Sequence, residues 1–365
     1  MPVRGERDSR VADLRVASWP GYGATHNPFV GIFLRGLEAA GCAVSSIDAI
    51  AALQGQDSDI VLLHWAERIF GEARSRRQVL ANMTLLLRLL DRLPARTRIV
   101  WLVHNLRPHD ARLLQRLVWP FYVRALSRRV DGFLTLSPAT VDPVRKALPG
   151  LAGKPGLGLW HPFYPDAAPD RAGRLAARQA RGWSPGELVL GYCGQIRPYK
   201  GVEDLAAAFL GTTRTDLRLV LAGTPSAPGL AERLRQMAAG DARIRLELAD
   251  LPDEAFGAVL GACDVVVAPL RDYLHSGSIL HALSAGRPVL TPDTAFAAAL
   301  QGRLGPGWLR LYRGPLTPAL LEDAAVPAPA TGPDLAGFAA DATGRQAAGF
   351  FRSLLAGAGF SVRHP

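Results

Sequence analysis

Cysteine is scarce in this sequence of 365 residues, with only Cys42, Cys193 and Cys263 present and far apart. An odd number without metal-ligand spacing argues against a disulfide scaffold and a cysteine zinc site, and it suits a reducing cytoplasm. No apolar run approaches the roughly 20 residues that span a bilayer. The first 15 residues contain no apolar stretch of the kind found in secretion signals. We therefore expect neither a secreted mini-protein nor an integral membrane protein.

Acidic residues are scarce in only one half of the chain. Residues 1–165 contain 22 Lys and Arg against 13 Asp and Glu, a net charge of +9, whereas the remainder contains 20 against 19, a net charge of +1. Within residues 71–130 there are 13 arginines and three acids. This asymmetry predicts an anionic partner for the first half alone, such as a phosphate, a nucleic acid or an acidic membrane surface. Because no nucleic-acid-binding motif accompanies the charge, we expect no nucleic acid.

Short apolar runs alternate with amphipathic stretches along both halves, which is typical of βαβ units in buried parallel sheets. In the first half we predict strands at residues 14–18, 43–47, 60–63, 99–103 and 132–136, with helices at 28–40, 76–93 and 111–127. In the second half we predict strands at 188–193, 217–222, 244–246, 265–269, 289–291 and 309–312, with helices at 202–209, 228–239, 253–262 and 278–285.

These patterns predict an α/β protein with two Rossmann-like domains that face a central cleft. The first domain covers residues 1–165 and the second covers 166–337, with a proline-rich polar linker from 162 to about 185. A final helix within residues 338–365 could pack back on the first domain. Ligands of such sheets bind beyond the carboxyl ends of the strands, so the residues that follow each strand are the candidates for function.

Two cations follow the first strand of the second half, on a loop bounded by Gly194 and Gly201. The glycines let the backbone approach a ligand closely, while Arg197 and Lys200 place positive charge beside a predicted helix N-terminus. This combination predicts a diphosphate site, and the alternative is a solvated basic turn. The residue order of a Walker motif is absent.

A second segment of the same half, Ser276-Gly277-Ser278, begins a predicted helix. Serines at this position can cap the helix. They can equally offer N–H and O–H groups to a phosphate oxygen. Because the segment follows strand 265–269, we expect it to face the same cleft as Lys200, which favours the phosphate role.

Polar side chains follow the strands of the first half, where a carboxylate or an imidazole could deprotonate a sugar hydroxyl. The candidates are Asn27, Glu67, His104, Asn105, His109, Asp110 and His161. Asp110 is the first choice for the base, followed by His109 and Glu67. The alternative for Asp110 is that it only caps helix 111–127.

Metal-ligand patterns are weak in this sequence. Asp57-Ser58-Asp59 has D-x-D spacing but precedes its strand, at the wrong edge of the sheet. A loop does not fix the spacing of His104 and His109, and no G-x-S-x-G nucleophile motif is present. We predict no metal and no cofactor.

The predicted helices 76–93 and 111–127 combine apolar residues with arginine, Trp119 and Tyr122. This combination suits the interface of an anionic membrane. The arginines that we expect to take part are Arg74, Arg76, Arg77, Arg128 and Arg129. The alternative is that the apolar faces pack on the sheet and the arginines are merely solvated.

Seven segments carry a family resemblance: residues 27–29 (NPF), 63–67 (LHWAE), 104–110 (HNLRPHD), 196–203 (IRPYKGVE), 276–278 (SGS), 287–290 (RPVL) and 305–308 (GPGW). Together they resemble GT-B glycosyltransferases, and more narrowly the bacterial β-mannosyltransferase family of xanthan assembly. The resemblance implies that mannose passes from GDP-mannose to a polyprenyl-diphosphate-linked oligosaccharide in exopolysaccharide biosynthesis. That reaction would take place at the inner face of the cytoplasmic membrane, without a metal.

The resemblance also divides the candidate residues between the two substrates. Donor binding would use Gly194, Arg197, Tyr199, Lys200, Ser276, Gly277 and Ser278. Acceptor binding would use Asn27, His104, Asn105 and His161.

Departures from the family pattern bear on the stereochemistry. Many retaining members carry two glutamates eight residues apart, but Tyr273 and His281 stand at those positions, which favours inversion. The family carboxylate beside the second histidine falls at Asp110, which is Asp here rather than Glu. A glucosyl- or glucuronosyltransferase of the same fold that uses a UDP-sugar is an alternative, and so is a non-catalytic module that binds a sugar nucleotide or a lipid.

Overall fold

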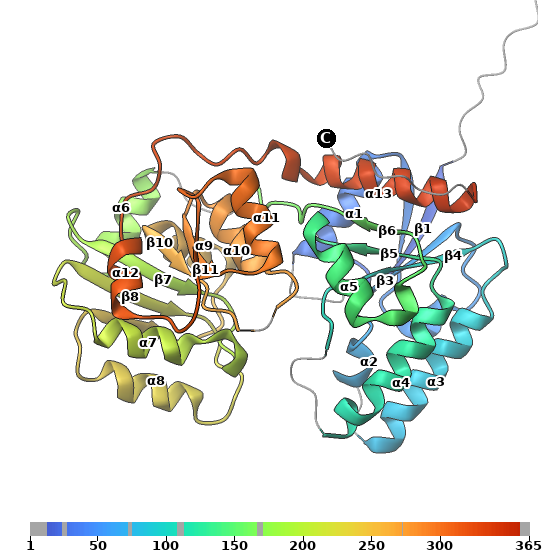
Figure 1. The fold of residues 1–365 in the computed structure, drawn as a ribbon, viewed down its shortest axis with the longest axis horizontal. Helices are drawn as coiled ribbons and strands as arrows, with labels where there is room; N and C mark the ends of the chain where they lie inside the picture. Colours follow the sequence, from blue (N-terminus) through green and yellow to red (C-terminus); the bar gives the residue numbers. More distant parts are fainter. Residues whose placement is uncertain are drawn as a thin grey trace, which may run out of the picture.

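The computed structural model describes residues 13–23, 28–71, 75–107, 113–165, 171–271 and 273–357. These residues form two halves, each built on a parallel sheet of six strands with helices on both faces (Figure 1). This architecture confirms the predicted α/β fold class with two Rossmann-like domains.

The N-terminal sheet has the strand order β2-β1-β3-β4-β5-β6, and every neighbouring pair is parallel. Its strands are β1 (Leu14–Trp19), β2 (Cys42–Ser46), β3 (Ile60–His64), β4 (Arg98–Leu102), β5 (Gly132–Thr135) and β6 (Gly156–Gly158). Its helices are α1 (Phe29–Ala39), η1 (Ile50–Leu53), α2 (Arg68–Gly71), α3 (Arg76–Asp91), α4 (Leu113–Arg129), η2 (Pro138–Thr140), α5 (Val141–Ala147) and η3 (Pro149–Leu151).

The C-terminal sheet has the order β12-β11-β10-β7-β8-β9 and is also parallel throughout. Its strands are β7 (Leu188–Cys193), β8 (Leu217–Ala222), β9 (Ile244–Glu247), β10 (Val265–Val267), β11 (Val289–Pro292) and β12 (Leu309–Tyr312). Its helices are α6 (Arg171–Gln179), η4 (Pro198–Lys200), α7 (Val202–Leu210), α8 (Leu230–Ala238), α9 (Asp253–Ala262), α10 (Gly277–Ser284), α11 (Ala295–Leu304) and α12 (Pro318–Ala324).

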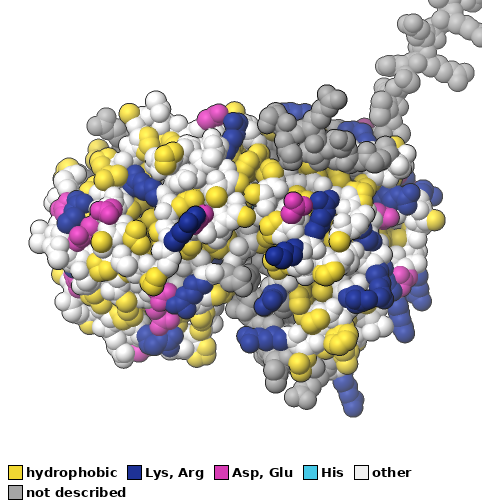
Figure 2. All heavy atoms as spheres, viewed as in Figure 1, with side chains coloured by type: hydrophobic (Ala, Val, Ile, Leu, Met, Phe, Trp, Pro, Cys, Tyr) yellow, Lys and Arg dark blue, Asp and Glu magenta, His cyan; other side chains and the backbone are white. Residues whose placement is uncertain are grey.

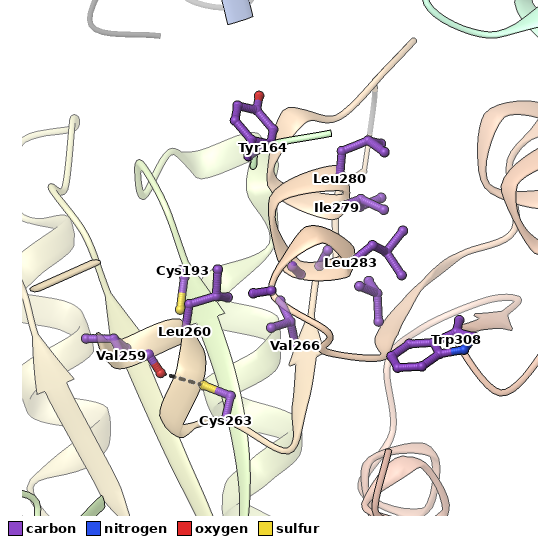
Figure 3. Close-up of a cluster of buried hydrophobic side chains, with 14 of the residues drawn as sticks. Tyr164, Cys193, Val259, Leu260, Cys263, Val266, Ile279, Leu280, Leu283 and Trp308 are labelled. Atoms are coloured by element: carbon purple, nitrogen blue, oxygen red, sulfur yellow. Dashed lines mark hydrogen bonds between the residues drawn. The ribbon is translucent and has the colours of Figure 1, made fainter. Parts of the chain in front are cut away.

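Both faces of each sheet are buried, because successive residues of a strand point to opposite sides. In β1, for example, Val16 packs on the side of α1, whereas Ala17 packs on the side of α3 and α4. In the C-terminal half, one cluster joins the sheet to α9, α10 and α11 and includes Cys193 and Cys263 (Figure 3). The opposite cluster joins the sheet to α7, α8 and α12. The strand ends are therefore held rigidly by two packed layers.

After the C-terminal sheet, the chain returns to the N-terminal half through η5 (Ala336–Phe338) and α13 (Ala340–Leu355), which lies beside α1 (Figure 1). Two glycines allow the helices to touch. A Cβ on Gly344 would lie 1.9 Å from the carbonyl oxygen of Gly36, and a Cβ on Gly36 would lie 2.1 Å from that of Ala340. Phe350 and Phe351 of α13 are fully buried in the N-terminal core.

The predicted linker is partly wrong, because α6 lies within it. Its arginines make that segment look polar, yet they bind the carbonyl groups where α9 ends. Arg174 donates to the carbonyl oxygens of Gly261 and Cys263, and Arg174 and Arg178 both pair with Asp264. Helices α5, α11 and α12 and strand β6 were not predicted either. α4 runs through Pro120 and ends at Arg129.

Candidate active site

The carboxyl ends of β3 and β4 bring two polar side chains together at one edge of the N-terminal sheet. These strands are adjacent and parallel, so the residues that follow them leave the sheet side by side. The amide Nδ2 of Asn105 donates to Oε1 of Glu67 over 2.6 Å. Of the predicted catalytic residues, Glu67 is the one that the described part of the chain contains.

Glu67 has an unusual acidity for a carboxylic acid. Burial disfavours its charged form and raises its pKa from 4.5 to about 7, although the Asn105 amide, its own backbone and Arg68 act in the opposite direction. A carboxyl with a pKa near neutrality can both hold and release a proton at physiological pH, which is the property a general base needs.

A pair of buried histidines lies at the carboxyl ends of the same two strands, β3 and β4. His64 Nδ1 and His104 Nε2 are 3.2 Å apart, and the ring of Phe29 packs edge-on against both. Burial lowers the pKa of His64 to about 3 and also lowers that of His104, so both rings are neutral. Trp65 stacks on His104 with 4.1 Å between ring centroids. Its backbone has φ = +37°, a rare value outside glycine that often marks a functional segment.

In the C-terminal half, β7 leads into the predicted donor loop. Gly194 adopts φ = +134°, and Gly201 adopts φ = +68°, where a Cβ would lie 2.3 Å from the carbonyl oxygen of Pro269. The single turn η4 then presents Tyr199 and Lys200 directly before α7. Arg197 is half-buried, and its guanidinium donates to Gln195 Oε1 over 2.6 Å.

The start of α10 adjoins this loop. Ser276 caps the helix, since its hydroxyl accepts from the backbone N–H of Ile279 over 3.3 Å. Ser278 faces the loop, because a Cβ on Gly194 would lie 3.3 Å from its hydroxyl oxygen. The structure therefore brings the two predicted donor segments together, and it gives Ser276 the capping role that was its alternative.

The two halves meet at His275, the residue before the cap. Its Nε2 accepts from the backbone N–H of Leu136 over 3.1 Å and lies 2.8 Å from Oγ1 of Thr140, so a residue of the C-terminal half binds the segment after β5. Burial lowers the pKa of His275, with a smaller contribution from His161. Because a charged imidazole cannot accept a hydrogen bond, this contact requires the neutral ring.

His161 belongs to the crossing from the first half to the second. It is buried, and its Nε2 would lie 3.8 Å from a Cβ on Gly277, at the start of α10. It also lies close enough to His104 and His275 to influence the pKa of both. His161 thus stands between the strand ends of one half and the helix start of the other.

Three predicted residues, Asn27, His109 and Asp110, lie outside the described residues. Both aspartates of the D-x-D segment form ion pairs with arginine. Asp57 pairs with Arg15 and Arg96, and Asp59 pairs with Arg15. Within the described ranges, no group of three or more His, Cys, Asp or Glu side chains could hold a metal ion.

His275 and Tyr164 were not predicted as site residues. Both act across the junction between the halves, which a pattern within one segment does not reveal. The signal was available for His275, since it directly precedes the predicted Ser276-Gly277-Ser278 motif. Tyr164 lay in the expected linker.

The chain has two parallel sheets that meet at the carboxyl ends of their strands. One half carries a cation-bearing loop and the other a near-neutral carboxyl. These are the features of a GT-B glycosyltransferase. The model of the family "Glycosyl transferases group 1" matches residues 187–310. A GDP-mannose:glycolipid 4-beta-D-mannosyltransferase of Xanthomonas campestris pv. campestris is 31% identical over 265 residues, which is 72% of this chain and 70% of that protein. The chain belongs to the glycosyltransferase family that this enzyme represents.

Solved structures agree on the fold. HepE of Anabaena in complex with UDP-glucose superposes with a TM-score of 0.61 at 14% identity and covers 94% of this chain and 98% of its own. AviGT4, a glycosyltransferase of avilamycin A biosynthesis, superposes with a TM-score of 0.58 at 16% identity and covers 94% and 99%. At these identities the likeness concerns the fold alone.

Proposed function

We propose that the protein transfers mannose from GDP-mannose, with inversion and without a metal, to a polyprenyl-diphosphate-linked oligosaccharide in exopolysaccharide biosynthesis. The observation that carries this proposal is the Glu67–Asn105 pair, a near-neutral carboxyl in the half opposite the cation-bearing loop. The likeness to the Xanthomonas mannosyltransferase supports the choice of donor and acceptor.

The donor half supplies charge to the leaving group. As the bond between the sugar C1 and the phosphate oxygen breaks, negative charge grows on the diphosphate. Arg197 and Lys200 stabilise that charge, and Gly194, Tyr199, Gly277 and Ser278 line the same site. Because these cations and the N-terminus of α10 neutralise the diphosphate, the reaction does not need a divalent ion.

The acceptor half supplies the base. Glu67 takes the proton of the attacking hydroxyl, and Asn105 orients its carboxyl and favours the charged form. His104 and Asn27 contribute to acceptor binding, whereas His161, which was predicted with them, lies beside Gly277 at the start of α10. Asp110 and His109 stay alternative bases, and the comparison of Asp110→Asn, His109→Ala and Glu67→Gln decides among the three.

Inversion is favoured by the residues at the two positions where retaining relatives carry glutamate. The hydroxyl of Tyr273 lies 3.2 Å from Thr291 Oγ1, and the ring of His281 stacks on Tyr164 with 4.5 Å between centroids. Neither is a carboxylate that could assist a retaining reaction. A direct displacement by one base on the acceptor side is the simpler chemistry for this site.

A UDP-sugar donor is the second candidate, because a structural neighbour of the same fold holds UDP-glucose. The test is incubation with radiolabelled GDP-mannose, UDP-glucose and UDP-glucuronate in the presence of bacterial lipid extract. We expect label in the lipid fraction from GDP-mannose, with a β-linkage by NMR. Transfer from a UDP-sugar alone would overturn the choice of donor, and an α-linkage would overturn inversion.

The same proposal places the enzyme on an anionic membrane through α3 and α4. These helices pack side by side and expose four large apolar residues, namely Leu80, Leu85, Leu117 and Phe121. The same two helices and their ends also carry exposed arginines, at positions 77, 88, 92, 116, 124 and 128. Figure 2 shows hydrophobic and basic side chains gathered over this end of the N-terminal half. No helix of the described residues is long and apolar enough to cross a bilayer.

One arginine expected at the membrane has another contact, since Arg129 forms two hydrogen bonds with Asp91, at 2.7 and 2.8 Å. Arg74 and the side chain of Arg76 lie outside the described set. Leu117, Phe121, Arg124 and Arg128 share one face of α4, which gives the interface an apolar centre with a basic rim. Each basic side chain contributes about 1 kcal/mol at an anionic surface.

Vesicle sedimentation tests this surface. We expect binding to vesicles with phosphatidylglycerol, loss at high salt, and loss in a Leu117→Gln/Phe121→Gln variant. Leu175→Gln is the matched control, because Leu175 is an exposed leucine of the C-terminal half. If the two variants bind the vesicles equally, the exposed apolar residues of α3 and α4 face solvent and do not contact the membrane.

A further inference from the structure

Two buried side chains of the crossing between the halves point at the start of α10. A Cβ on Gly277 would lie 2.8 Å from the hydroxyl oxygen of Tyr164 and 3.8 Å from Nε2 of His161. Tyr164 is 6% exposed and His161 4% exposed. Figure 3 shows the Tyr164 hydroxyl pointing away from the apolar cluster that holds the ring. Neither polar atom has a hydrogen-bond partner among the described residues, although each group is more than nine-tenths buried.

The orientation of His161 is fixed by its other nitrogen. Nδ1 lies 2.8 Å from the carbonyl oxygen of Pro162, so Nδ1 carries the proton and donates. Nε2 therefore carries a lone pair in the free protein and lies beside Gly277, at the start of α10. A lone pair repels a phosphate oxygen, whereas an Nε2–H group binds one.

We propose that His161 and Tyr164 complete the phosphate site of the donor, where His161 binds as an imidazolium and so takes up one proton from solvent when the nucleoside diphosphate binds. The inference rests on the proposed function, because it takes the ligand to be the leaving diphosphate of a sugar nucleotide. It adds two residues of the interdomain crossing to a site otherwise built from the C-terminal half.

The surroundings of His161 explain why it is neutral until a ligand arrives. The titratable groups that face it are His104, His275, His281 and Tyr164. Burial lowers the pKa of His161 to about 4, and His281 contributes in the same direction. None of these neighbours is a carboxylate, so an entering phosphate would be the first anion beside the ring. An opposite charge at contact distance raises the pKa of an imidazole.

Tyr164 has the complementary property. Burial raises the pKa of its hydroxyl, which therefore stays protonated and serves as a hydrogen-bond donor. Its ring is held by stacking on His281, which packs in turn against Phe256. The hydroxyl thus occupies a fixed position beside Gly277, where a side chain in place of the glycine hydrogen would collide with it.

A phosphate at this point could belong to either substrate, since a polyprenyl-linked acceptor also carries a diphosphate. The location favours the donor. Gly277 is followed by Ser278, which adjoins Gly194 of the loop that carries Arg197 and Lys200. An acceptor diphosphate would instead follow the lipid to the membrane-facing helices α3 and α4.

Isothermal titration calorimetry of the full chain at pH 7.5, in two buffers that differ in ionisation enthalpy, measures the proton uptake directly. We expect GDP binding to take up close to one proton in the wild type and none in His161→Gln, with affinity weakened about 10- to 100-fold. Tyr164→Phe should weaken binding about 3- to 10-fold and keep the proton uptake. His281→Gln, which removes the ring that stacks on Tyr164 but keeps His161, should retain the uptake.

Equal proton uptake in the wild type and His161→Gln would overturn the inference while leaving the proposed function intact. Proton uptake on titration with farnesyl diphosphate but not with GDP would overturn the assignment to the donor. If neither GDP nor UDP binds a folded protein, the proposed function fails together with the inference.

Discussion

Removing the Asn105 amide should make Glu67 a weaker acid and move the pH dependence of catalysis. The Nδ2–H bond of 2.6 Å stabilises the charged carboxylate against a burial penalty that has already raised its pKa to about 7. A hydrogen bond to a charged group contributes about 1.5–3 kcal/mol, and 1.36 kcal/mol corresponds to one pKa unit. The side chain of Glu67 keeps some contact with solvent, so the lower end of that range applies. Asn105→Ala should therefore raise the pKa of Glu67 by about one unit.

The assay is the pH profile of kcat/KM, which reports the pKa of an essential base in the free enzyme. In the wild type we expect kcat/KM to decline as the pH is lowered past about 7. In Asn105→Ala the decline should begin at about pH 8, if the pKa of Glu67 moves by that one unit. In Glu67→Gln, kcat/KM should be about 10²–10⁴-fold lower than in the wild type. Asn82→Ala is the matched control, since its amide donates to the carbonyl of Ile69 rather than to a carboxylate. An acid limb that stays in place in Asn105→Ala would refute the role of this pair.

The same carboxyl links catalysis to stability. Its folded pKa lies above the unfolded value of 4.5, so the folded state favours the protonated form and loses stability as the pH rises from about 4.5 to 7. Glu67→Gln removes this ionisation. At pH 8 the free energy of unfolding of the variant, measured in a denaturant melt, should therefore exceed that of the wild type by about 1–3 kcal/mol. At pH 4 the two proteins should be equally stable. A variant no more stable at pH 8 would contradict the burial of the charge.

Three further predictions concern the donor, the metal and the helix contact. Lys200→Ala and Arg197→Ala should each lower kcat/KM for the sugar nucleotide by about 10- to 100-fold, measured with unlabelled acceptor in excess. Activity should survive EDTA, and loss restored by Mg²⁺ or Mn²⁺ would show that the protein cations do not suffice. Gly344→Ala should cost about 1–3 kcal/mol in a denaturant melt, because its Cβ would meet the carbonyl of Gly36, whereas Gly349→Ala on the same helix has open space and should stabilise by about 0.5–1 kcal/mol.

The strands and the residues that follow them were predictable, because the strands of a buried parallel sheet are continuous apolar runs that end at glycine or polar residues. Strand β7, for example, ends where Gly194 begins the predicted loop, and α10 begins within one residue of its predicted start. The juxtaposition of Glu67 with Asn105 follows from parallel order, since β3 and β4 are neighbours. These are local patterns that tertiary packing preserves.

Contacts across the junction were not predictable, because they join segments with no shared pattern. The bond between His275 and Leu136 connects residues 139 positions apart. The charge on α6 was misleading for the same reason. Arg174 and Arg178 look like solvated residues until their partners at the end of α9 are known. The pKa of Glu67 likewise depends on burial, which one sequence does not give.

The geometry of the whole site depends on the two segments that connect the halves. The first crossing contains Trp160, His161 and Phe163, and the second contains Phe338 and leads to Thr343. The backbone N–H of Phe163 donates to the carbonyl oxygen of Phe338 over 2.9 Å. The hydroxyl of Thr343 donates to the carbonyl oxygen of Trp160 over 3.2 Å. The base is in one half and the diphosphate cations are in the other. Any change in the angle between the halves must therefore bend the two connecting segments, which are hydrogen-bonded to each other. Because His161 is part of the first crossing, the residue proposed to bind the phosphate also belongs to the connection between the half with the base and the half with the cations.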